Sequence, residues 1–163
     1  MHVFKELEIR GTWIARTPRH VDSRGWLVEV FRQDWLDEGN LGQATPAMSY
    51  ISLTKPGVVR GPHEHREQTD YFGFIGPSTF RIVLWDNRLK SRTFGVRLVM
   101  HLGEDDPALL IVPPGIVHAY KNVGDADGLV LNLPNRLFAG RNKKEPVDEI
   151  RYEDTPQGKF SLE

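Results

Sequence analysis

Hydrophobic and polar residues alternate along many short stretches of this chain, and a period of two is typical of β-strands. The stretches richest in β-branched and aromatic residues are predicted to be strands, at residues 12–15, 26–31, 48–53, 58–65, 70–75, 79–85, 95–101, 109–112, 117–122 and 128–133. Turn-forming groups such as Lys55-Pro56-Gly57 and Val123-Gly124-Asp125 separate them. We therefore expect an all-β sandwich or barrel, and a jelly roll fits the number of strands.

The remaining parts of the chain complete the predicted organisation. Residues 33–38 suit a short helix, and the polar, Lys/Glu-rich extension from residue 136 onward is expected to cross the barrel surface as a loop or short strand. The sequence contains no internal repeat, low-complexity tract or linker. With 163 residues it is expected to form one domain, residues 1–163, with a core at about residues 24–135.

Three histidines carry the candidate chemistry. His63 and His65 are two residues apart, so on a strand their side chains point to the same face. His118 follows about fifty residues later, far enough along the chain to return on another strand. The sequence therefore predicts three imidazoles that converge inside a barrel, as a metal site or a proton-transfer site.

Composition and charge narrow the classes of function. Lys and Arg (21) nearly balance Asp and Glu (22), so the formal net charge is -1 and neither nucleic acid nor a membrane surface is an expected partner. There are no cysteines, which excludes disulfides and thiolate ligands. The N-terminus lacks a signal-peptide core and no apolar run reaches membrane-spanning length, so we expect a cytoplasmic protein.

The histidine segments resemble the two motifs of the cupin superfamily. The first motif, a glycine followed by His-x-His, an acid and a second glycine, is matched by Gly57, His63, His65, Asp70 and Gly76. The second motif, Pro-x-Gly-x-x-His-x-x-x-Asn, is matched by Pro113, Gly115, His118 and Asn122. This resemblance implies a cupin-type jelly-roll barrel.

A narrower resemblance covers nearly the whole chain. Residues 22–31, 57–63, 91–95, 112–118 and 148–154 resemble, in the same order, segments of the dTDP-4-dehydrorhamnose 3,5-epimerases. The resemblance implies a homodimeric isomerase of carbohydrate biosynthesis, whose N-terminal strand is exchanged between subunits. Its substrate would be a nucleotide-linked, dTDP-type 4-keto sugar, from which a proton next to the carbonyl is abstracted.

The same resemblance implies roles for individual residues. His63 matches the family's base, and the adjacent His65 would relay the proton or donate to the enolate oxygen, with His118 assisting. Arg60 matches an arginine that contacts the diphosphate, and Arg24 and Glu29 match positions at the nucleotide end of the site. Tyr120 is a further expected substrate contact.

The chain departs from the epimerase pattern at several functional positions. The acid of the family's His-Asp dyad would lie beyond the end of this sequence, and its acid tyrosine would fall near Leu131 or Asn132. Tyr71 and Tyr120 are the alternatives for that phenol. The family's lysine would fall near Thr69, and Leu27 stands where the family has a thymine-stacking aromatic. His65 instead resembles the Gly-x-His-x-His pattern of nucleotide-sugar 3,4-ketoisomerases.

Metal binding is the rival use of the same residues. A ligand set that suits Zn, Fe, Mn, Ni or Cu is offered by His63, His65, His118 and Asp70, with Glu67 or Glu64 as alternatives to Asp70. No organic cofactor is expected. Two other functions therefore stay open beside the isomerase. One is a metal-dependent cupin of another reaction class, such as a dioxygenase or a non-nucleotide sugar isomerase, and the other is a non-catalytic sugar-binding relative.

Overall fold

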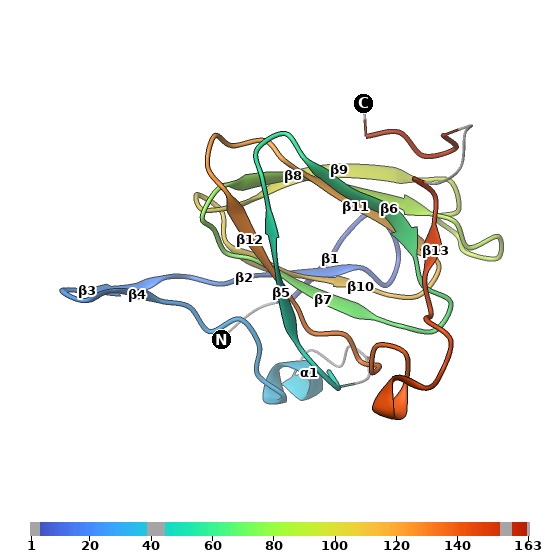
Figure 1. Cartoon of the computed structure of the whole chain (residues 1–163), viewed down its shortest axis with the longest axis horizontal. Coiled ribbons are helices and arrows are strands. Elements are labelled where there is room, and N and C mark those ends of the chain that lie inside the picture. The colour runs from blue at the N-terminus through green and yellow to red at the C-terminus, as the bar shows by residue number, and fades with distance from the viewer. Residues whose placement is uncertain (1–3, 39–44, 154–157, 163) are drawn as a thin grey trace.

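Two antiparallel sheets packed face to face form the body of the protein (Figure 1). The computed structural model describes residues 4–38, 45–153 and 158–162. The six-stranded sheet consists, in spatial order, of β1 (Lys5–Glu6), β2 (Trp13–Arg16), β10 (Ala108–Val112), β7 (Asp70–Phe74), β12 (Gly128–Asn132) and β5 (Tyr50–Thr54). The five-stranded sheet consists of β13 (Ile150–Arg151), β6 (Val59–Glu64), β11 (Ile116–Asn122), β8 (Thr79–Asp86) and β9 (Arg97–Gly103). This arrangement confirms the predicted all-β, jelly-roll class.

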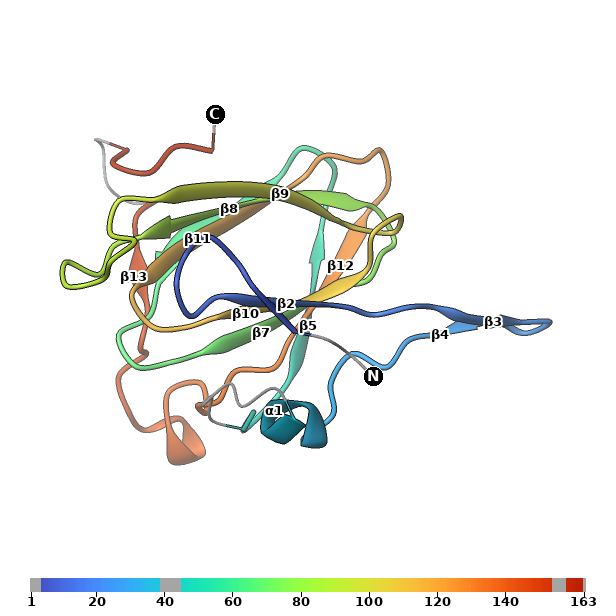
Figure 2. The same ribbon diagram turned by 180° about the vertical axis from the view of Figure 1, so that it is seen from behind.

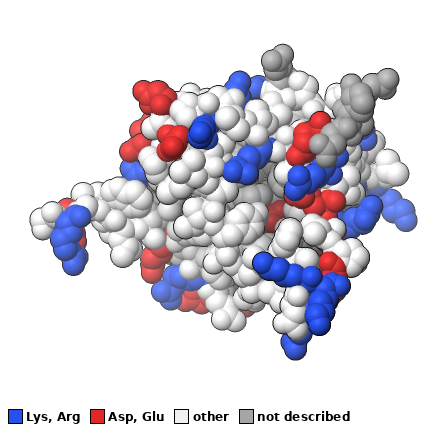
Figure 3. Space-filling view, viewed as in Figure 1, with Lys and Arg blue, Asp and Glu red and all other residues white. Residues whose placement is uncertain are grey.

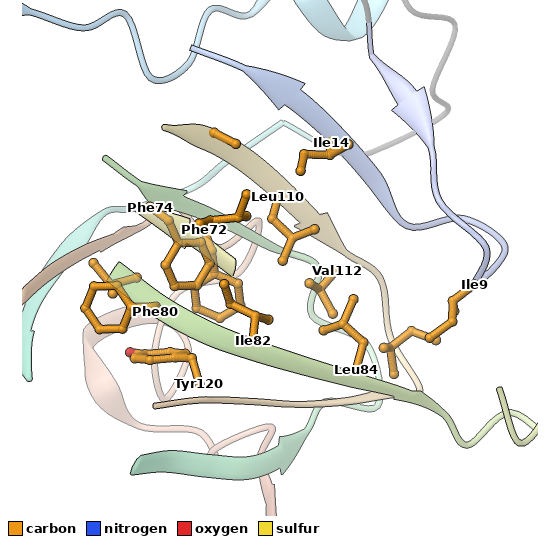
Figure 4. Close-up of a cluster of buried hydrophobic side chains, with 14 residues drawn as sticks. Ile9, Ile14, Phe72, Phe74, Phe80, Ile82, Leu84, Leu110, Val112 and Tyr120 are labelled. Atoms are coloured by element: carbon orange, nitrogen blue, oxygen red, sulfur yellow. The ribbon is translucent and has the colours of Figure 1, made fainter. Parts of the chain in front are cut away.

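The core between the sheets explains why strand β10 is apolar at every position. Its residues Ala108, Leu110 and Val112 point into the space between the sheets, where they join a cluster of buried apolar side chains from both sheets. Figure 4 shows aromatic rings at one end of this cluster and aliphatic side chains at the other. Leu109 and Ile111 point the opposite way and pack under helix α1 (Asp34–Glu38). Each such side chain stabilises the fold by roughly 1.5–3 kcal/mol when it is fully buried. The short helix therefore covers the part of the outer face of the six-stranded sheet that lies over β10 and β7.

A two-stranded arm differs from the sequence prediction. The predicted strand at residues 26–31 is shorter, because β4 (Gly25–Leu27) pairs only with β3 (His20–Asp22) and residues 28–30 have no neighbouring strand. The arm extends away from the body in both views (Figures 1 and 2). Every other predicted strand overlaps an observed one, whereas β1 and β3 are too short to be detected from periodicity. None of the helices in the described ranges has the length and apolarity to span a membrane.

The C-terminal extension follows the outer face of the five-stranded sheet. Strand β13 pairs with the edge of β6, as the prediction of a short surface strand allowed. Beyond it, Tyr152, Phe160 and Leu162 pack on the outward side chains of β8 and β11, including Trp85. This docking brings the acidic residues of the extension to the end of β6 that carries the histidines.

Candidate active site

The three predicted histidines converge. His63 on β6 lies directly opposite His118 on β11, and the centroids of their rings are 6.4 Å apart. His65, just past the end of β6, stacks on His118 with ring centroids 5.6 Å apart. The structure thus brings the three imidazoles together at one end of β6 and β11.

The close pairing of β6 and β11 depends on Gly61. Its φ of 86° lies in the left-handed region, and a Cβ atom there would stand 2.6 Å from the carbonyl oxygen of His118. The register of the two strands shifts between His118 and Tyr120, next to this close approach. Glycine is the residue that tolerates both the dihedral angle and the contact, so it lets His63 and His118 face each other.

The histidines lie in a cavity of about 940 Å³ between the two sheets. One wall is formed by β6 and β11, which contribute Arg60 and Tyr120 besides the histidines, and the opposite wall by β5 and β7. Residues 134–149 close a further side, and Figure 3 shows Lys and Arg side chains around η1 (Arg141–Lys143) on this part of the surface. The volume is within the usual range for a small-molecule site.

A buried carboxylate joins two of the histidines. Asp70 Oδ2 lies 3.2 Å from His65 Nε2 and 3.7 Å from His118 Nε2. The Nδ1 atoms of both rings face backbone carbonyl oxygens, that of Asp148 for His65 and that of Ile116 for His118. Both imidazoles are therefore oriented by the backbone, with Nε2 directed at Asp70.

The charges of this group follow from burial and pairing. Burial lowers the pKa of His118 to about 4, so its imidazole is neutral at neutral pH. Burial alone would also lower the pKa of His65, but the adjacent Asp70 carboxylate, with its opposite charge, raises it to about 9. Burial opposes ionisation of Asp70, yet His65, His118 and Asn132 hold its pKa below the usual value. The cluster is thus an ion pair of His65 and Asp70 beside a neutral His118.

This cluster also fits a metal ion. One ligand atom from each of His65, Asp70 and His118 lies within 4.8 Å of the other two. Asp70 Oδ2 is buried and has no hydrogen-bond partner of good geometry among the described residues. The contacts of His65 Nδ1 and His118 Nδ1 with backbone carbonyl oxygens are of the kind that orients metal-binding histidines. His63, the fourth predicted ligand, lies outside this group of close donor atoms.

His63 instead contacts two carboxylates that the sequence interpretation missed. Its Nε2 lies 2.6 Å from Glu153 Oε1, and its Nδ1 lies 3.3 Å from Glu149 Oε1. Strand β13 explains the arrangement, because Arg151 pairs with His63 and the residues two positions to either side share its face. Glu149 and Glu153 are visible in the sequence as two carboxylates on one face of a possible strand. Only the pairing of β13 with β6 shows that this face meets His63. Asp154, in the same matched segment, lies outside the described residues.

The predicted substrate-binding residues separate into two groups. Arg60 and Tyr120 line the cavity, and Arg60 is fixed there by hydrogen bonds from its guanidinium to Thr54 Oγ1 and the Leu53 carbonyl. Arg24 lies at the tip of the arm, where it pairs with Asp22, and Glu29 follows the arm next to Arg32. Neither Arg24 nor Glu29 lines the cavity of its own chain.

Comparison with known proteins decides the family. The family model described as dTDP-4-dehydrorhamnose 3,5-epimerase matches residues 6–145. The chain belongs to this family. The resemblance inferred from the five matching segments is thereby confirmed, and the family is one of sugar isomerases with the cupin fold.

Several relatives illustrate the position of the chain within the epimerase family. It is 38% identical over 120 residues to the probable low-salt glycan biosynthesis epimerase Agl13 of Haloferax volcanii, covering 73% of this chain and 74% of that protein. It is 35% identical to the spore coat polysaccharide biosynthesis protein SpsL of Bacillus subtilis, covering 92% of this chain and 94% of that protein. A dTDP sugar isomerase from Desulfovibrio desulfuricans has the same fold, with a TM-score of 0.80 at 23% identity over 97% of this chain and 94% of that one.

Proposed function

We propose that this protein epimerises or isomerises a dTDP-linked 4-keto sugar by abstracting a proton from a carbon next to the ketone. The observation that carries the proposal is the position of His63, a cavity-lining imidazole held between two carboxylates in a member of this epimerase family. A histidine is suited to this step because its ordinary pKa lies near working pH.

The contacts of His63 suggest which nitrogen takes the proton. Glu149 lines the cavity whereas Glu153 is not part of its lining, so Nδ1 faces the side on which a substrate would lie. Glu153, at 2.6 Å from Nε2, then holds the tautomer and stabilises the imidazolium from behind. The Glu149 carboxylate also accepts a hydrogen bond from Arg151 Nε at 2.7 Å. It would move away from His63 Nδ1 when substrate enters the cavity.

The rest of the cavity supports a charged keto-sugar ligand. Arg60 presents a fixed guanidinium for phosphate oxygens, and the ring of Tyr120 lies beside it on the same wall. His65, an imidazolium at neutral pH, would favour the negative enolate oxygen through its charge, with the neutral His118 packed behind it.

Completion of the nucleotide end requires a second copy of the chain. We assign Arg24 and Glu29 to the cavity of a partner subunit in a homodimer, because the arm carries them away from their own cavity. The arm exposes apolar side chains that association would cover: Val21 is 76% exposed, Trp26 48% and Leu27 61%.

Solvent exchange tests the proposed reaction. Incubation with a dTDP-linked 4-keto sugar in deuterium oxide should introduce deuterium at a carbon next to the ketone, as seen by mass spectrometry. His63→Asn should slow this exchange by about 10²–10⁴-fold, because general-base catalysis contributes that much. No exchange by the wild type with any such sugar would contradict the proposal. Tight binding without exchange would favour the non-catalytic sugar-binding relative.

A metal-dependent cupin of another reaction class is the second candidate, favoured by the close donor atoms of His65, Asp70 and His118. A divalent ion held there would polarise a carbonyl or activate oxygen. Plasma mass spectrometry of the protein, purified without chelators, measures metal per chain. This candidate requires near-stoichiometric metal that is lost in His118→Ala and retained in His63→Ala, since His63 lies outside the donor group. A wild type that stays metal-free after addition of divalent ions would exclude it.

A further inference from the structure

The phenol of Tyr50 lines the cavity on the wall opposite His63. Tyr50 begins β5, the edge of the six-stranded sheet, whereas His63 lies on β6 in the five-stranded sheet. Both side chains line the same cavity, so a ligand between the sheets would have the imidazole on one side and the phenol on the other.

A fixed amide holds the phenol oxygen. Asn132 pairs with Tyr50 across the β12–β5 ladder, and its Nδ2 donates to the Tyr50 hydroxyl at 2.9 Å and to Asp70 Oδ1 at 2.8 Å. The other amide atom, Asn132 Oδ1, accepts from the backbone N–H of Tyr71 at 3.2 Å, which fixes which end of the amide faces Tyr50. Because the phenol oxygen accepts this bond, its own proton can be directed into the cavity.

The other three tyrosines are used differently. Tyr152 donates its hydroxyl proton to Glu64 at 2.6 Å on the outer face of the sheet. Tyr71 is fully buried in the cluster under helix α1 and does not line the cavity. Tyr120 lines the cavity, but its ring packs among Phe72, Phe74 and Phe80 and its hydroxyl is bonded to Ser52 at 3.2 Å. Tyr50 is the phenol that combines cavity exposure with an available proton.

We propose that Tyr50 is the general acid of the reaction and delivers a proton to the sugar carbon on the face opposite His63. This inference rests on the proposed function. His63 takes the proton from the C–H bond, and the electron pair forms an enolate. The enolate carbon then takes the proton of Tyr50, the carbonyl re-forms with inverted configuration, and Tyr50 becomes a phenolate that the Asn132 amide stabilises. Water returns a proton to Tyr50 and removes one from His63, which restores the site.

The protonation state of Tyr50 suits this role. Burial raises the pKa of Tyr50 to about 12, so the phenol keeps its proton throughout the neutral range. An acid must be protonated when the enolate forms, and Tyr50 meets that condition without any change in pH.

Separate measurement of exchange and inversion in Tyr50→Phe tests the assignment. With a dTDP-linked 4-keto sugar in deuterium oxide, we expect this variant to form inverted product at least about 100-fold more slowly than wild type. Recovered substrate should still acquire deuterium within about tenfold of the wild-type rate, because His63 can remove the proton and return a deuteron to the same face. Tyr120→Phe is the matched control, and it should keep the wild-type ratio of inversion to exchange whatever it does to binding.

The outcomes are distinct. Inversion by Tyr50→Phe at the wild-type rate would overturn the assignment. The assignment would also be overturned if Tyr50→Phe lost exchange as well as inversion while unfolding at the wild-type temperature. Removal of the C–H proton would then depend on Tyr50. A wild type that catalyses neither step would refute the proposed function itself, and the assignment of Tyr50 with it.

Discussion

At the scale of single residues, the reactivity of this site depends on how one imidazole is held. His63 contacts Glu153 through Nε2 and Glu149 through Nδ1, and only the second carboxylate lines the cavity. A carboxylate behind a catalytic histidine fixes its tautomer and compensates the charge it acquires. The two glutamates are therefore chemically alike but are not expected to be equivalent in function.

Replacement of each glutamate by its amide should reveal the difference. We expect Glu153→Gln to lower kcat by about 10²–10⁴-fold with little change in KM, because an amide does not stabilise the imidazolium. Glu149→Gln should lower kcat less, since its carboxylate must leave Nδ1 before the proton is taken. Steady-state kinetics of both variants checks this, and a larger effect of Glu149→Gln on kcat would reverse the assignment of the two nitrogens.

At the scale of the strands, the site is assembled by the antiparallel pairing of β6 and β11. Gly61 allows the backbones to approach so closely that a methyl group would meet the His118 carbonyl oxygen at 2.6 Å. The same pairing sets His63 opposite His118. Stability and site geometry therefore depend on the same glycine.

Gly61→Ala and Gly57→Ala should separate backbone strain from the steric clash. Both glycines have positive φ, 86° for Gly61 and 74° for Gly57, but a Cβ atom at Gly57 meets nothing within 4 Å. We expect Gly57→Ala to cost about 1–2 kcal/mol of unfolding free energy from strain. Gly61→Ala should cost about 2–5 kcal/mol, because overpacking adds to that strain. Denaturant titration measures the unfolding free energy of both variants. Equal losses would show that the contact between the new Cβ atom of Gly61→Ala and the His118 carbonyl oxygen is relieved without a cost in stability.

At the scale of the whole molecule, the arm is the part of the chain that would connect the two subunits of the proposed homodimer. It carries Arg24 and is followed by Glu29, and neither side chain lines its own cavity. The exposed Trp26 and Leu27 lie on the same hairpin, with the Arg19 guanidinium 4.6 Å from the centre of the Trp26 ring. A second copy of the chain would cover these apolar side chains and receive Arg24 and Glu29.

The double variant Trp26→Ser/Leu27→Ser should weaken both association and nucleotide binding. We expect light scattering after size-exclusion chromatography to show a shift from two chains to one, because the association loses buried apolar area. The affinity for dTDP should fall at least about tenfold, which corresponds to about 1.4 kcal/mol. Leu89→Ser is the matched control, since Leu89 is 83% exposed and lies on the β8–β9 connection. A double variant that stays dimeric with unchanged dTDP affinity would contradict this role of the arm.

Local patterns in the sequence were sufficient for the fold class and for the three histidines. Alternation with a period of two fixes which side chains share a face, so the strands and the common direction of His63 and His65 could be predicted without knowing their neighbours. The residues and spacing of the two histidine segments, together with the other matching segments, were likewise sufficient to identify the family.

Contacts between distant segments decided the rest. Glu149 and Glu153 reach His63 only because β13 pairs with β6, and Tyr50 gains its amide donor only because β5 pairs with β12. Strand pairing depends on which edges meet in space, and periodicity within one strand carries no information about that. The separation of Arg24 and Glu29 from the cavity has the same origin, since β3 and β4 pair only with each other and the arm that they form extends away from the body. The sequence by itself therefore determined the architecture and singled out His63, whereas the tertiary structure decided which groups surround that histidine.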